Sequence, residues 1–341
     1  MNASDLSQLP LPYDGMKGKT IVILGSTGLI ASTLVEKLCN LDDTLGLGLE
    51  LVVTYRDKAK AERRFSGLET GCSIEYLRYD VTEPFPDVDV DFIIHSASPA
   101  HPKAFVEDPV GVMKANIDGV TNVLEHARIH PGTRVLYVSS GEVYGAKTEN
   151  RPYAETDIGL LDPLNFRACY PESKRAAETL CRCYQHQYGV DSVIVRPGHV
   201  YGPALMSEST RVDVQFMRNA LAGEDILMKS LGLQRRSYIH VDDVVSGMLF
   251  AMLKGGSGEA YNISNRHSDV TIREYAEILA GIAGVSVRME VDAASCAGSS
   301  QVQDSTLDSS KLEALGWVPR ICMEEGLRGT FDALRSRDRA L

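Results

Sequence analysis

The sequence lacks the features that mark secreted, disulfide-bonded or membrane-spanning proteins. Its seven cysteines, at positions 39, 72, 169, 181, 183, 296 and 322, are scattered, and neither a CxxC pair nor a histidine-rich tract accompanies them. This usage predicts no disulfide framework and no metal site, and it fits reduced thiols in a cytoplasm. The first residues have no apolar signal core, and no run of about 18 apolar residues occurs. We therefore expect neither secretion nor a membrane span.

The sequence also lacks any block of Lys or Arg. Its 35 basic residues against 46 acidic ones give a formal net charge of -11. This balance argues against nucleic acid or an anionic membrane as a partner, although a few local arginines can still hold a small anionic ligand. With 341 residues, 44% of them hydrophobic, the chain can form one large α/β domain, alone or with a smaller lobe.

Short β-branched runs alternate with helical patterns in the first two thirds of the chain. Strands are expected at 20–25, 49–55, 73–80, 91–98, 134–140 and 191–198, and helices at 30–40, 110–128 and 172–189. Near-continuous apolar strands joined by long crossovers indicate a parallel sheet that is covered on both faces. We predict a doubly wound, Rossmann-type α/β fold.

The pattern changes gradually after about residue 197. An irregular loop is expected at 199–213, followed by helices at 214–223 and 241–256, a strand at 259–264 and a helical C-terminal part. We predict an N-terminal extension at 1–17, a larger domain at 18–198 plus 237–264, and a smaller interleaved lobe at 199–236 and 265–341. Residues 294–306 are the most loop-like stretch, either a mobile flap over a ligand or a solvated surface loop.

The segment "VILGSTGLIAS" places two glycines between the first strand and the first helix. A glycine-rich turn there lets backbone N–H groups approach a pyrophosphate at the positive end of the helix. Ala31 stands at the third small position and is compatible with close packing of the helix on the strand. The strand–turn–helix context predicts a dinucleotide site in the larger domain rather than a structural turn, with a cradle formed by Gly25, Thr27, Gly28, Leu29 and Ile30.

The second strand ends without the acid that would bind a ribose 2′-hydroxyl. Thr54 stands at that place, and Arg56 just beyond it can accept a 2′-phosphate, so both NAD and NADP stay open, with NAD as the first expectation. Asp80, at the end of the third strand, either contacts the adenine or caps the next turn. The predicted cofactor-binding set is completed by Val81, Ser96 and Ala97.

The segment "YPESK" places Tyr170 and Lys174 on one helical face. A tyrosine with a pKa of about 10 is a poor base, but a neighbouring ammonium and the positive nicotinamide of an oxidised cofactor both favour its anion. Tyr170 can then remove a hydroxyl proton while hydride leaves the same carbon. Ser140, at the end of a strand, is placed to hydrogen-bond that oxygen, and Lys174 also suits the cofactor ribose.

With these residues the chain resembles the extended short-chain dehydrogenase/reductases that act on nucleotide sugars. The resemblance covers about residues 18–335, and its landmarks are "TGLIAS", "SSGEVYG", "YPESK", "RPGHVYGP" and "YIHVDDV". It implies a tightly held NAD, oxidation of the sugar at C4, chemistry beside the new ketone, and return of the hydride. It also implies a homodimer in which helices near 112–127 and 170–188 pair across a two-fold axis.

Within that family the segments 96–110 and 167–180 are most similar to UDP-glucuronate decarboxylases. Those enzymes and the 4,6-dehydratases share a glutamate two residues after the active-site hydroxyl, which the 4-epimerases generally lack. A C4 ketone acidifies the C5 hydrogen or labilises a C5 carboxylate, so Glu142 can move a proton there. The predicted catalytic set is Ser140, Glu142, Tyr170 and Lys174; a turn or cap role is the alternative for Glu142.

Three positions depart from the decarboxylase pattern: Gly141 stands where dehydratases carry Asp and decarboxylases commonly Ser, Phe105 replaces a tyrosine, and His199 replaces an asparagine. Arg211 and Arg236 match positions that meet the nucleotide-sugar end, and a guanidinium suits phosphate or carboxylate. Arg167 meets either a substrate carboxylate or a surface acid. The predicted substrate-binding set is Ser98, Arg167, His199, Arg211 and Arg236.

The sequence thus predicts an NAD-dependent nucleotide-sugar enzyme that oxidises C4, acts at C5 and reduces C4 again. A decarboxylase or a 4,6-dehydratase is favoured. The alternatives are a 4-epimerase, an NADP-dependent nucleotide-sugar reductase, and a non-catalytic sensor, against which the complete Ser140, Tyr170 and Lys174 set argues. The nucleotide base and the sugar stay open.

Overall fold

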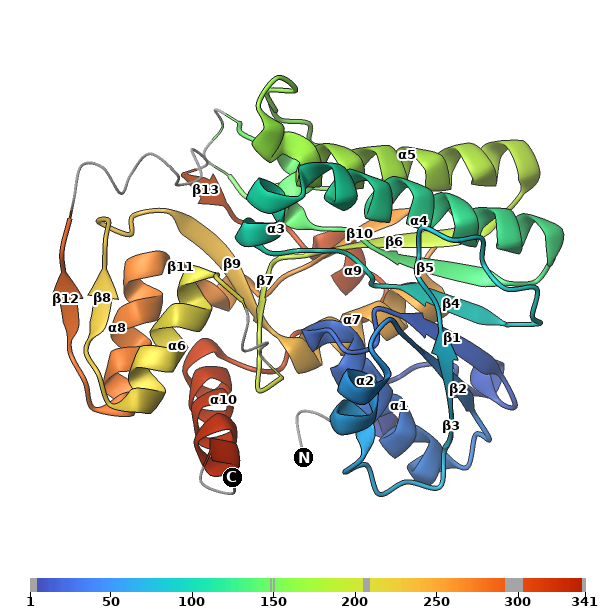
Figure 1. The fold of residues 1–341 in the computed structure, drawn as a ribbon, viewed down its shortest axis with the longest axis horizontal. Helices are drawn as coiled ribbons and strands as arrows, with labels where there is room; N and C mark the ends of the chain where they lie inside the picture. Colours follow the sequence, from blue (N-terminus) through green and yellow to red (C-terminus); the bar gives the residue numbers. More distant parts are fainter. Residues whose placement is uncertain (1–4, 148, 150, 205–208, 292–302, 339–341) are drawn as a thin grey trace.

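A seven-stranded parallel sheet lies at the centre of the computed structural model, which describes residues 5–147, 149, 151–204, 209–291 and 303–338 (Figure 1). The strand order is β10-β6-β5-β4-β1-β2-β3. The strands are β1 (Thr20–Leu24), β2 (Glu50–Tyr55), β3 (Ser73–Arg78), β4 (Phe92–His95), β5 (Arg134–Val138), β6 (Asp191–Pro197) and β10 (Ala260–Ile263). The predicted doubly wound fold is confirmed.

Helices cover both faces of this sheet, as Figure 1 shows. On one face lie α1 (Leu29–Leu45), α2 (Lys58–Phe65) and α7 (Val241–Lys254); on the other lie α4 (Pro109–Ile129) and α5 (Cys169–Tyr188), with the short α3 (Pro102–Glu107) before them. Within β1, Ile21 and Ile23 pack towards α1 and α7, whereas Val22 and Leu24 pack towards α4 and α5. Two buried faces therefore explain why the inner strands are nearly continuously apolar, whereas the edge strand β3 is not.

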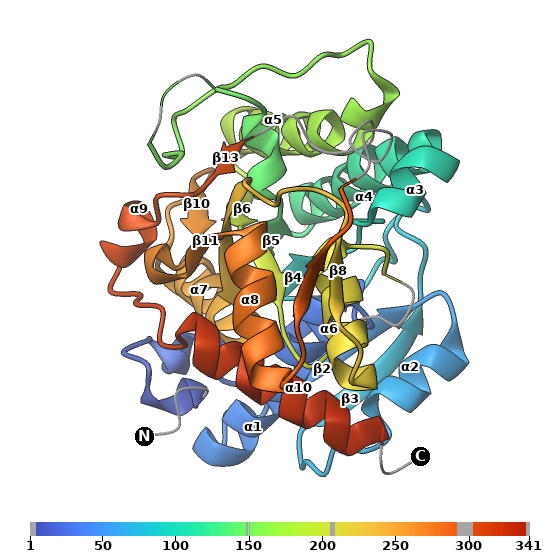
Figure 2. The same cartoon turned by 90° about the vertical axis from the view of Figure 1, so that its left-hand side faces the viewer.

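A smaller lobe, turned towards the viewer in Figure 2, contains two further sheets. In one, β9 (Arg235–His240) pairs with β7 (His199–Tyr201), β11 (Asp269–Thr271) and β13 (Asp304–Ser305); the other pairs β8 (Ile226–Met228) with β12 (Val287–Met289). The helices of this part are α6 (Val212–Ala222), α8 (Ile272–Ala283) and α10 (Met323–Asp338). The short α9 (Ser310–Glu313) contacts β10 and α7 instead, and it buries Leu312 in the core of the main sheet.

Two loop predictions were wrong in part. The expected loop at 199–213 begins with β7 and ends in α6, because a three-residue strand gives too short a sequence signal and its partner β9 comes later in the chain. Of the expected loop at 294–306, residues 294–302 lie outside the described residues, and Asp304–Ser305 form β13 through pairing with β9.

The domain boundaries stay a prediction. The structure places β10 and α7 with the main sheet, whereas β9 runs continuously through the predicted boundary at 236/237. The N-terminal residues from 5 onward form the short 3₁₀ turns Leu6–Gln8 and Tyr13–Met16, and they bury Leu6, Leu9 and Met16 in the core that contains α1.

Over the described ranges no helix is both long and apolar enough to cross a membrane.

The C-terminal segment is anchored on α7. Trp317, the single tryptophan of the sequence, is fully buried, and its indole N–H donates to Ser246 Oγ at 2.9 Å. Asp243, in the first turn of α7, accepts from the backbone N–H groups of Arg320 and Ile321 at 2.9 and 3.0 Å. These contacts fix the segment directly before α10 on α7 of the larger domain. Because α10 belongs to the lobe, they also connect the lobe to the larger domain.

Candidate active site

The turn between β1 and α1 has the geometry of a dinucleotide cradle. Gly25 has a φ of +74°, and a Cβ there would lie 2.7 Å from the Ala97 Cα, so only glycine fits. Gly28 precedes the first residue of α1, and Ala31 is fully buried against the sheet. The predicted cradle and the predicted Ser96–Ala97 segment after β4 therefore meet, since the Ser96 N–H donates to Leu24 O at 3.2 Å. The half-buried N-terminus of this helix suits a pyrophosphate.

The ends of β2 and β3 bring Arg56 and Asp80 together. Arg56 Nη1 lies 3.9 Å from the Asp80 carboxylate, at a largely exposed position. Asp80 also accepts hydrogen bonds from the Thr82 N–H and hydroxyl, which hold the pKa of Asp80 below its usual range. The capping role considered for Asp80 is thus present, and its adenine contact stays a prediction. Thr54 is buried and donates to Ile23 O.

Ser140, Tyr170 and Lys174 converge at the carboxyl ends of β4 and β5. Tyr170 stands in the first turn of α5, where its side chain is buried and hydrogen-bonds the Ser140 side chain. Lys174, one helical turn later, is 2% exposed and donates to Val138 O at 2.7 Å. Burial lowers the pKa of Lys174 to about 7, with the charge of Glu178 acting in the opposite direction.

The predicted anionic state of Tyr170 is not found in the chain by itself. Burial raises the pKa of Tyr170 well above its usual range, and the charge of Glu142 raises it further. The Ser140 hydroxyl and the guanidinium groups of Arg211 and Arg167 lower this pKa but do not offset burial. Tyr170 is therefore a neutral phenol at neutral pH until a cationic ligand lies beside it.

Glu142 begins the 3₁₀ turn Gly141–Tyr144 (η3), which Ser140 caps by accepting the Glu142 N–H at 3.2 Å. Its side chain is in contact with solvent, yet protein surrounds it closely enough that desolvation raises the pKa of Glu142. The charges of Arg167, Arg236 and Arg211 oppose this rise. The structure thus brings the predicted catalytic carboxylate together with three predicted substrate-binding arginines from separate segments.

Two of these arginines are held by the lobe. Arg211 donates to both carboxylate oxygens of Asp213, at 3.0 and 2.7 Å, and to Val200 O at 3.0 Å. Arg236 is 7% exposed and donates to Ser305 Oγ of β13 at 3.0 Å. These contacts place two fixed cations near Glu142, which is an arrangement suited to a diphosphate.

The other predicted substrate residues lie at the same end of the sheet. His199 is in β7, where burial and then the charges of Arg236 and Arg211 hold its pKa well below the usual range, so its imidazole is neutral. Ser98 follows β4, and its buried Oγ has no hydrogen-bond partner among the residues that the structure describes. A buried hydroxyl without a partner suits a ligand contact.

Sequence reasoning missed two residues behind the site. Asn116 of α4 is fully buried and donates to Ser173 Oγ at 2.9 Å, and Ser173 donates to the Tyr170 carbonyl oxygen at 3.0 Å. Leu307, after β13, packs on η3 so closely that a Cβ on Gly141 would lie 3.2 Å from it. The sequence signal for Asn116 was a polar amide on the otherwise apolar face of the α4 helix. Nothing in the local sequence indicated that Leu307 packs against Gly141.

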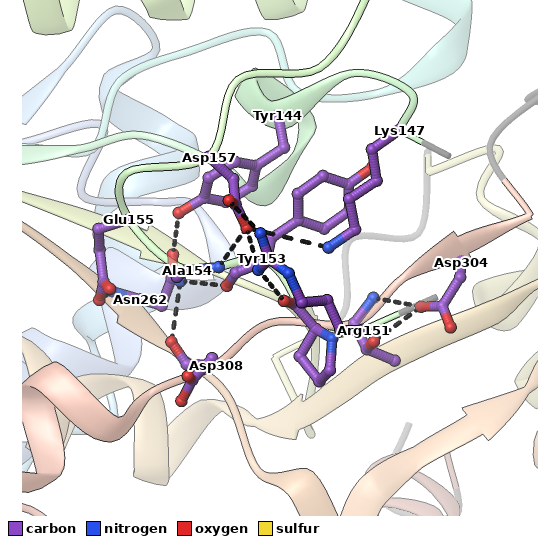
Figure 3. Close-up of polar contacts among 12 residues, drawn as sticks. Tyr144, Lys147, Arg151, Tyr153, Ala154, Glu155, Asp157, Asn262, Asp304 and Asp308 are labelled. Atoms are coloured by element: carbon purple, nitrogen blue, oxygen red, sulfur yellow. Dashed lines mark hydrogen bonds and ion pairs between the residues drawn. The ribbon is translucent and has the colours of Figure 1, made fainter. Parts of the chain in front are cut away.

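A polar network fixes the loop that follows Glu142 (Figure 3). The rings of Tyr144 and Tyr153 stack with centroids 4.8 Å apart, and the Tyr144 hydroxyl donates to Asn262 Oδ1 at 2.6 Å. Asn262 Nδ2 in turn donates to the carbonyl oxygens of Tyr153 and Asp308, both at 2.9 Å. The network joins η3 to β10 and to the C-terminal segment.

This glycine cradle and the Ser140, Tyr170 and Lys174 set on a doubly wound sheet define a dinucleotide-dependent enzyme of the short-chain dehydrogenase/reductase type. The chain belongs to the NAD dependent epimerase/dehydratase family, whose model matches residues 21–264. It is 32% identical over 314 residues to UDP-glucuronic acid decarboxylase 3 of Arabidopsis thaliana, an alignment that covers 90% of this chain and 86% of the relative.

Solved structures show the same fold. An NAD complex of UDP-glucose 4-epimerase from Thermus thermophilus is 25% identical, with a TM-score of 0.76 over 93% of this chain and 99% of that chain. A dTDP-glucose 4,6-dehydratase from Streptomyces venezuelae is 24% identical, with a TM-score of 0.80 over 94% of this chain and 98% of that chain. Family membership confirms the predicted enzyme class and NAD as the cofactor, and the cradle geometry fits that cofactor.

Proposed function

We propose that the protein decarboxylates a nucleotide-linked uronate of the UDP-glucuronate type, with no net oxidation or reduction. The observation that carries the proposal is the convergence of Arg167, Arg211 and Arg236 on Glu142, beside Tyr170. A diphosphate and a sugar carboxylate together bring the negative charge that three guanidinium groups match. The similarity to UDP-glucuronic acid decarboxylases over 90% of the chain supports this substrate class.

The cradle at Gly25 and Gly28 would hold the pyrophosphate of NAD, and Lys174 its nicotinamide ribose. When bound, NAD supplies reversible acceptance of a hydride from C4 of the sugar. The proton of the C4 hydroxyl goes to Tyr170, whose partner Ser140 hydrogen-bonds the same oxygen. Tyr170 returns that proton to the C4 oxygen at the end of the cycle.

The C4 ketone labilises the carboxylate on C5. The bond between C5 and C6 breaks, its electron pair stays on C5 as an enolate, and carbon dioxide leaves. Desolvation raises the pKa of Glu142, which makes this carboxyl group a better proton donor than an ordinary glutamate, and Glu142 gives its proton to C5. Solvent then reprotonates Glu142, so atoms and charge balance over the cycle.

The contact between Leu307 and Gly141 favours decarboxylation over dehydration. Loss of water from C6 requires an acid that protonates the departing hydroxyl, whereas loss of carbon dioxide requires none. Position 141, directly before Glu142, has no side chain, and Leu307 fills the adjoining space. No acid at this position can therefore assist a departing hydroxyl.

The test is an assay of the purified protein with UDP-glucuronate, using UDP-glucose and dTDP-glucose as controls. The proposal predicts release of one carbon dioxide and mass-spectrometric detection of a UDP-pentose, and no dehydrated product from the two controls. Formation of a UDP-uronate epimer without carbon dioxide would overturn it in favour of an epimerase. A requirement for stoichiometric NADPH would overturn it in favour of a reductase.

We also propose a homodimer that pairs through α4 and α5. These helices lie side by side over one face of the sheet (Figure 1). The outer surface of α4 exposes apolar side chains, with Val110 65% and Met113 38% exposed. Light scattering that shows a single dimeric species supports the proposal, and a mass of one chain at assay concentrations contradicts it.

A cytoplasmic location is the last part of the proposed function. Six cysteines in the described residues are free thiols, and four of them are buried. Free buried thiols fit a reducing compartment. Localisation of a tagged full chain by fractionation tests this, with recovery outside the cytoplasm as the contradicting result.

A further inference from the structure

Three side chains form a stack next to the proposed base. The guanidinium carbon of Arg167 lies 4.4 Å from the centroid of the Phe105 ring. On its other side, that ring lies 4.8 Å from the Tyr170 ring at an interplanar angle of 25°. Phe105 is 2% exposed and Tyr170 6%, so the platform under Arg167 is fixed by the core. A cation over an aromatic face is held electrostatically, which restricts where the guanidinium can lie.

Arg167 differs from the other arginines near Glu142 in how its donors are used. Arg211 is held by a carboxylate and Arg236 by Ser305. The Arg167 side chain has neither an ion pair nor a hydrogen bond over the ranges that the structure describes. Because the ring of Phe105 contacts the guanidinium through its face, the N–H edge of Arg167 stays available for a ligand.

The location of Arg167 points to one part of the sugar. Arg167 lies on the Phe105 ring, which in turn stacks on the Tyr170 ring, and its charge opposes the rise in the pKa of Glu142, so the guanidinium lies near both groups. In the proposed reaction Tyr170 acts at the C4 oxygen and Glu142 acts at C5. The substituent that can reach Arg167 from between these two groups is the one on C5.

We infer that Arg167 recognises the C6 carboxylate of the substrate, and that Phe105 is the residue that positions it for this contact. The inference rests on the proposed function and names what selects its substrate. A guanidinium binds a carboxylate by two parallel N–H···O bonds, which a neutral hydroxymethyl group cannot replace. Arg167 therefore discriminates uronates from neutral hexoses.

The first test measures binding by calorimetry to NAD-loaded protein in a Tyr170→Phe background, which blocks turnover. Arg167→Gln should weaken UDP-glucuronate binding by at least about tenfold and change UDP-glucose and UDP binding by less than about twofold. Arg235→Gln, which removes the same charge from an exposed neighbour of Arg236, is the matched control and should change none of them. Equal losses for UDP-glucuronate and UDP-glucose, or no loss for either, would overturn the inference.

The second test concerns Phe105 in the otherwise unchanged enzyme. Phe105→Leu should raise KM for UDP-glucuronate and shift the pH profile of kcat/KM. Phe105→Tyr keeps the aromatic ring and should have the KM and the pH profile of the wild-type enzyme. A folded Phe105→Leu variant with unchanged KM and pH profile would overturn the positioning role.

The two proposals fail separately. Selective uronate binding through Arg167 without release of carbon dioxide would overturn the proposed function and support the inference. Carbon dioxide release that is undiminished in Arg167→Gln would overturn the inference alone.

Discussion

Leu307, from the C-terminal segment, packs against Gly141 in the turn that carries Glu142. A Cβ on Gly141 would lie 3.2 and 3.4 Å from the two terminal methyl carbons of Leu307. Leu307 is 2% exposed, and its backbone N–H donates to Ser237 Oγ at 2.9 Å. The leucine therefore cannot withdraw without disturbing β9, and the turn and the lobe are packed as one unit.

We predict that Gly141→Ala and Leu307→Ala compensate each other. Gly141→Ala should lower the free energy of unfolding by about 1 kcal/mol because of overpacking, and Leu307→Ala by about 3 kcal/mol because of the cavity it leaves. The double variant should lose less than the sum, since the new methyl group enters that cavity. Chemical denaturation of the four proteins measures this, and strict additivity would contradict the contact.

Tyr170→Phe should lower turnover by about a thousandfold while leaving the fold intact, because it removes only the proton-transfer group. Tyr137→Phe is the matched control. The Tyr137 ring also lies beside the Lys174 ammonium, at 4.6 Å, and its buried hydroxyl has no hydrogen-bond partner in the described part of the chain. Steady-state rates of both variants test the assignment, and a Tyr170→Phe enzyme of near wild-type rate would remove the phenol from the mechanism.

Glu142→Gln should separate the two halves of the reaction. Its amide cannot supply a proton to C5, but Ser140, Tyr170 and Lys174 keep their places at C4. In a single turnover, the absorbance of reduced nicotinamide should therefore rise and persist while the pentose product fails to form. Glu172→Gln, a change of the same kind in the first turn of α5, should follow the wild-type time course. Normal product formation by Glu142→Gln would show that another group delivers the proton.

Glu178→Gln should change both the pH profile and the stability. Glu178 stands one turn after Lys174 and opposes the lowering of the Lys174 pKa, so its neutralisation should move that pKa below about 7 and shift the basic limb of kcat/KM to lower pH. It also bonds Arg196 through both oxygens, at 2.9 and 2.5 Å. Loss of this buried pair should cost about 3 kcal/mol in chemical denaturation. An unchanged basic limb would contradict the link to Lys174.

Asp243 should make the protein more stable in mild acid. Burial raises its pKa from 3.8 to about 6, so the folded state binds the proton more tightly than the unfolded state. The free energy of unfolding is then highest below about pH 4 and falls as pH rises through about 6, by about 3 kcal/mol in total from this group. Denaturation across this range should show the slope, and Asp243→Asn should flatten it. A slope that survives the substitution would assign it to other carboxyl groups.

The main sheet and the cofactor cradle were predictable because their signals are local. The inner strands are nearly continuous apolar runs, and the turn from Gly25 to Gly28 lies directly between a strand and a helix. The spacing of Tyr170 and Lys174 likewise places both on one helical face before any tertiary structure is known.

The remaining parts of the site depend on contacts between distant segments. β7 and β13 are two or three residues long and exist as strands because β9 pairs with them. The local sequence around Gly141 does not indicate that Leu307 fills its neighbouring space. The stack of Arg167, Phe105 and Tyr170 likewise joins α3 to the start of α5, which no spacing along the chain reveals.

The burial of Trp317 gives the protein an intrinsic fluorescent reporter. As the single tryptophan, it lies against α7 through its bond to Ser246, at the junction between the main sheet and the last helix. Its emission therefore follows docking of the C-terminal segment on the nucleotide-binding core, free of signal from any other indole. The order in which the two halves of the chain come together during refolding can be followed in the native sequence, without an added label.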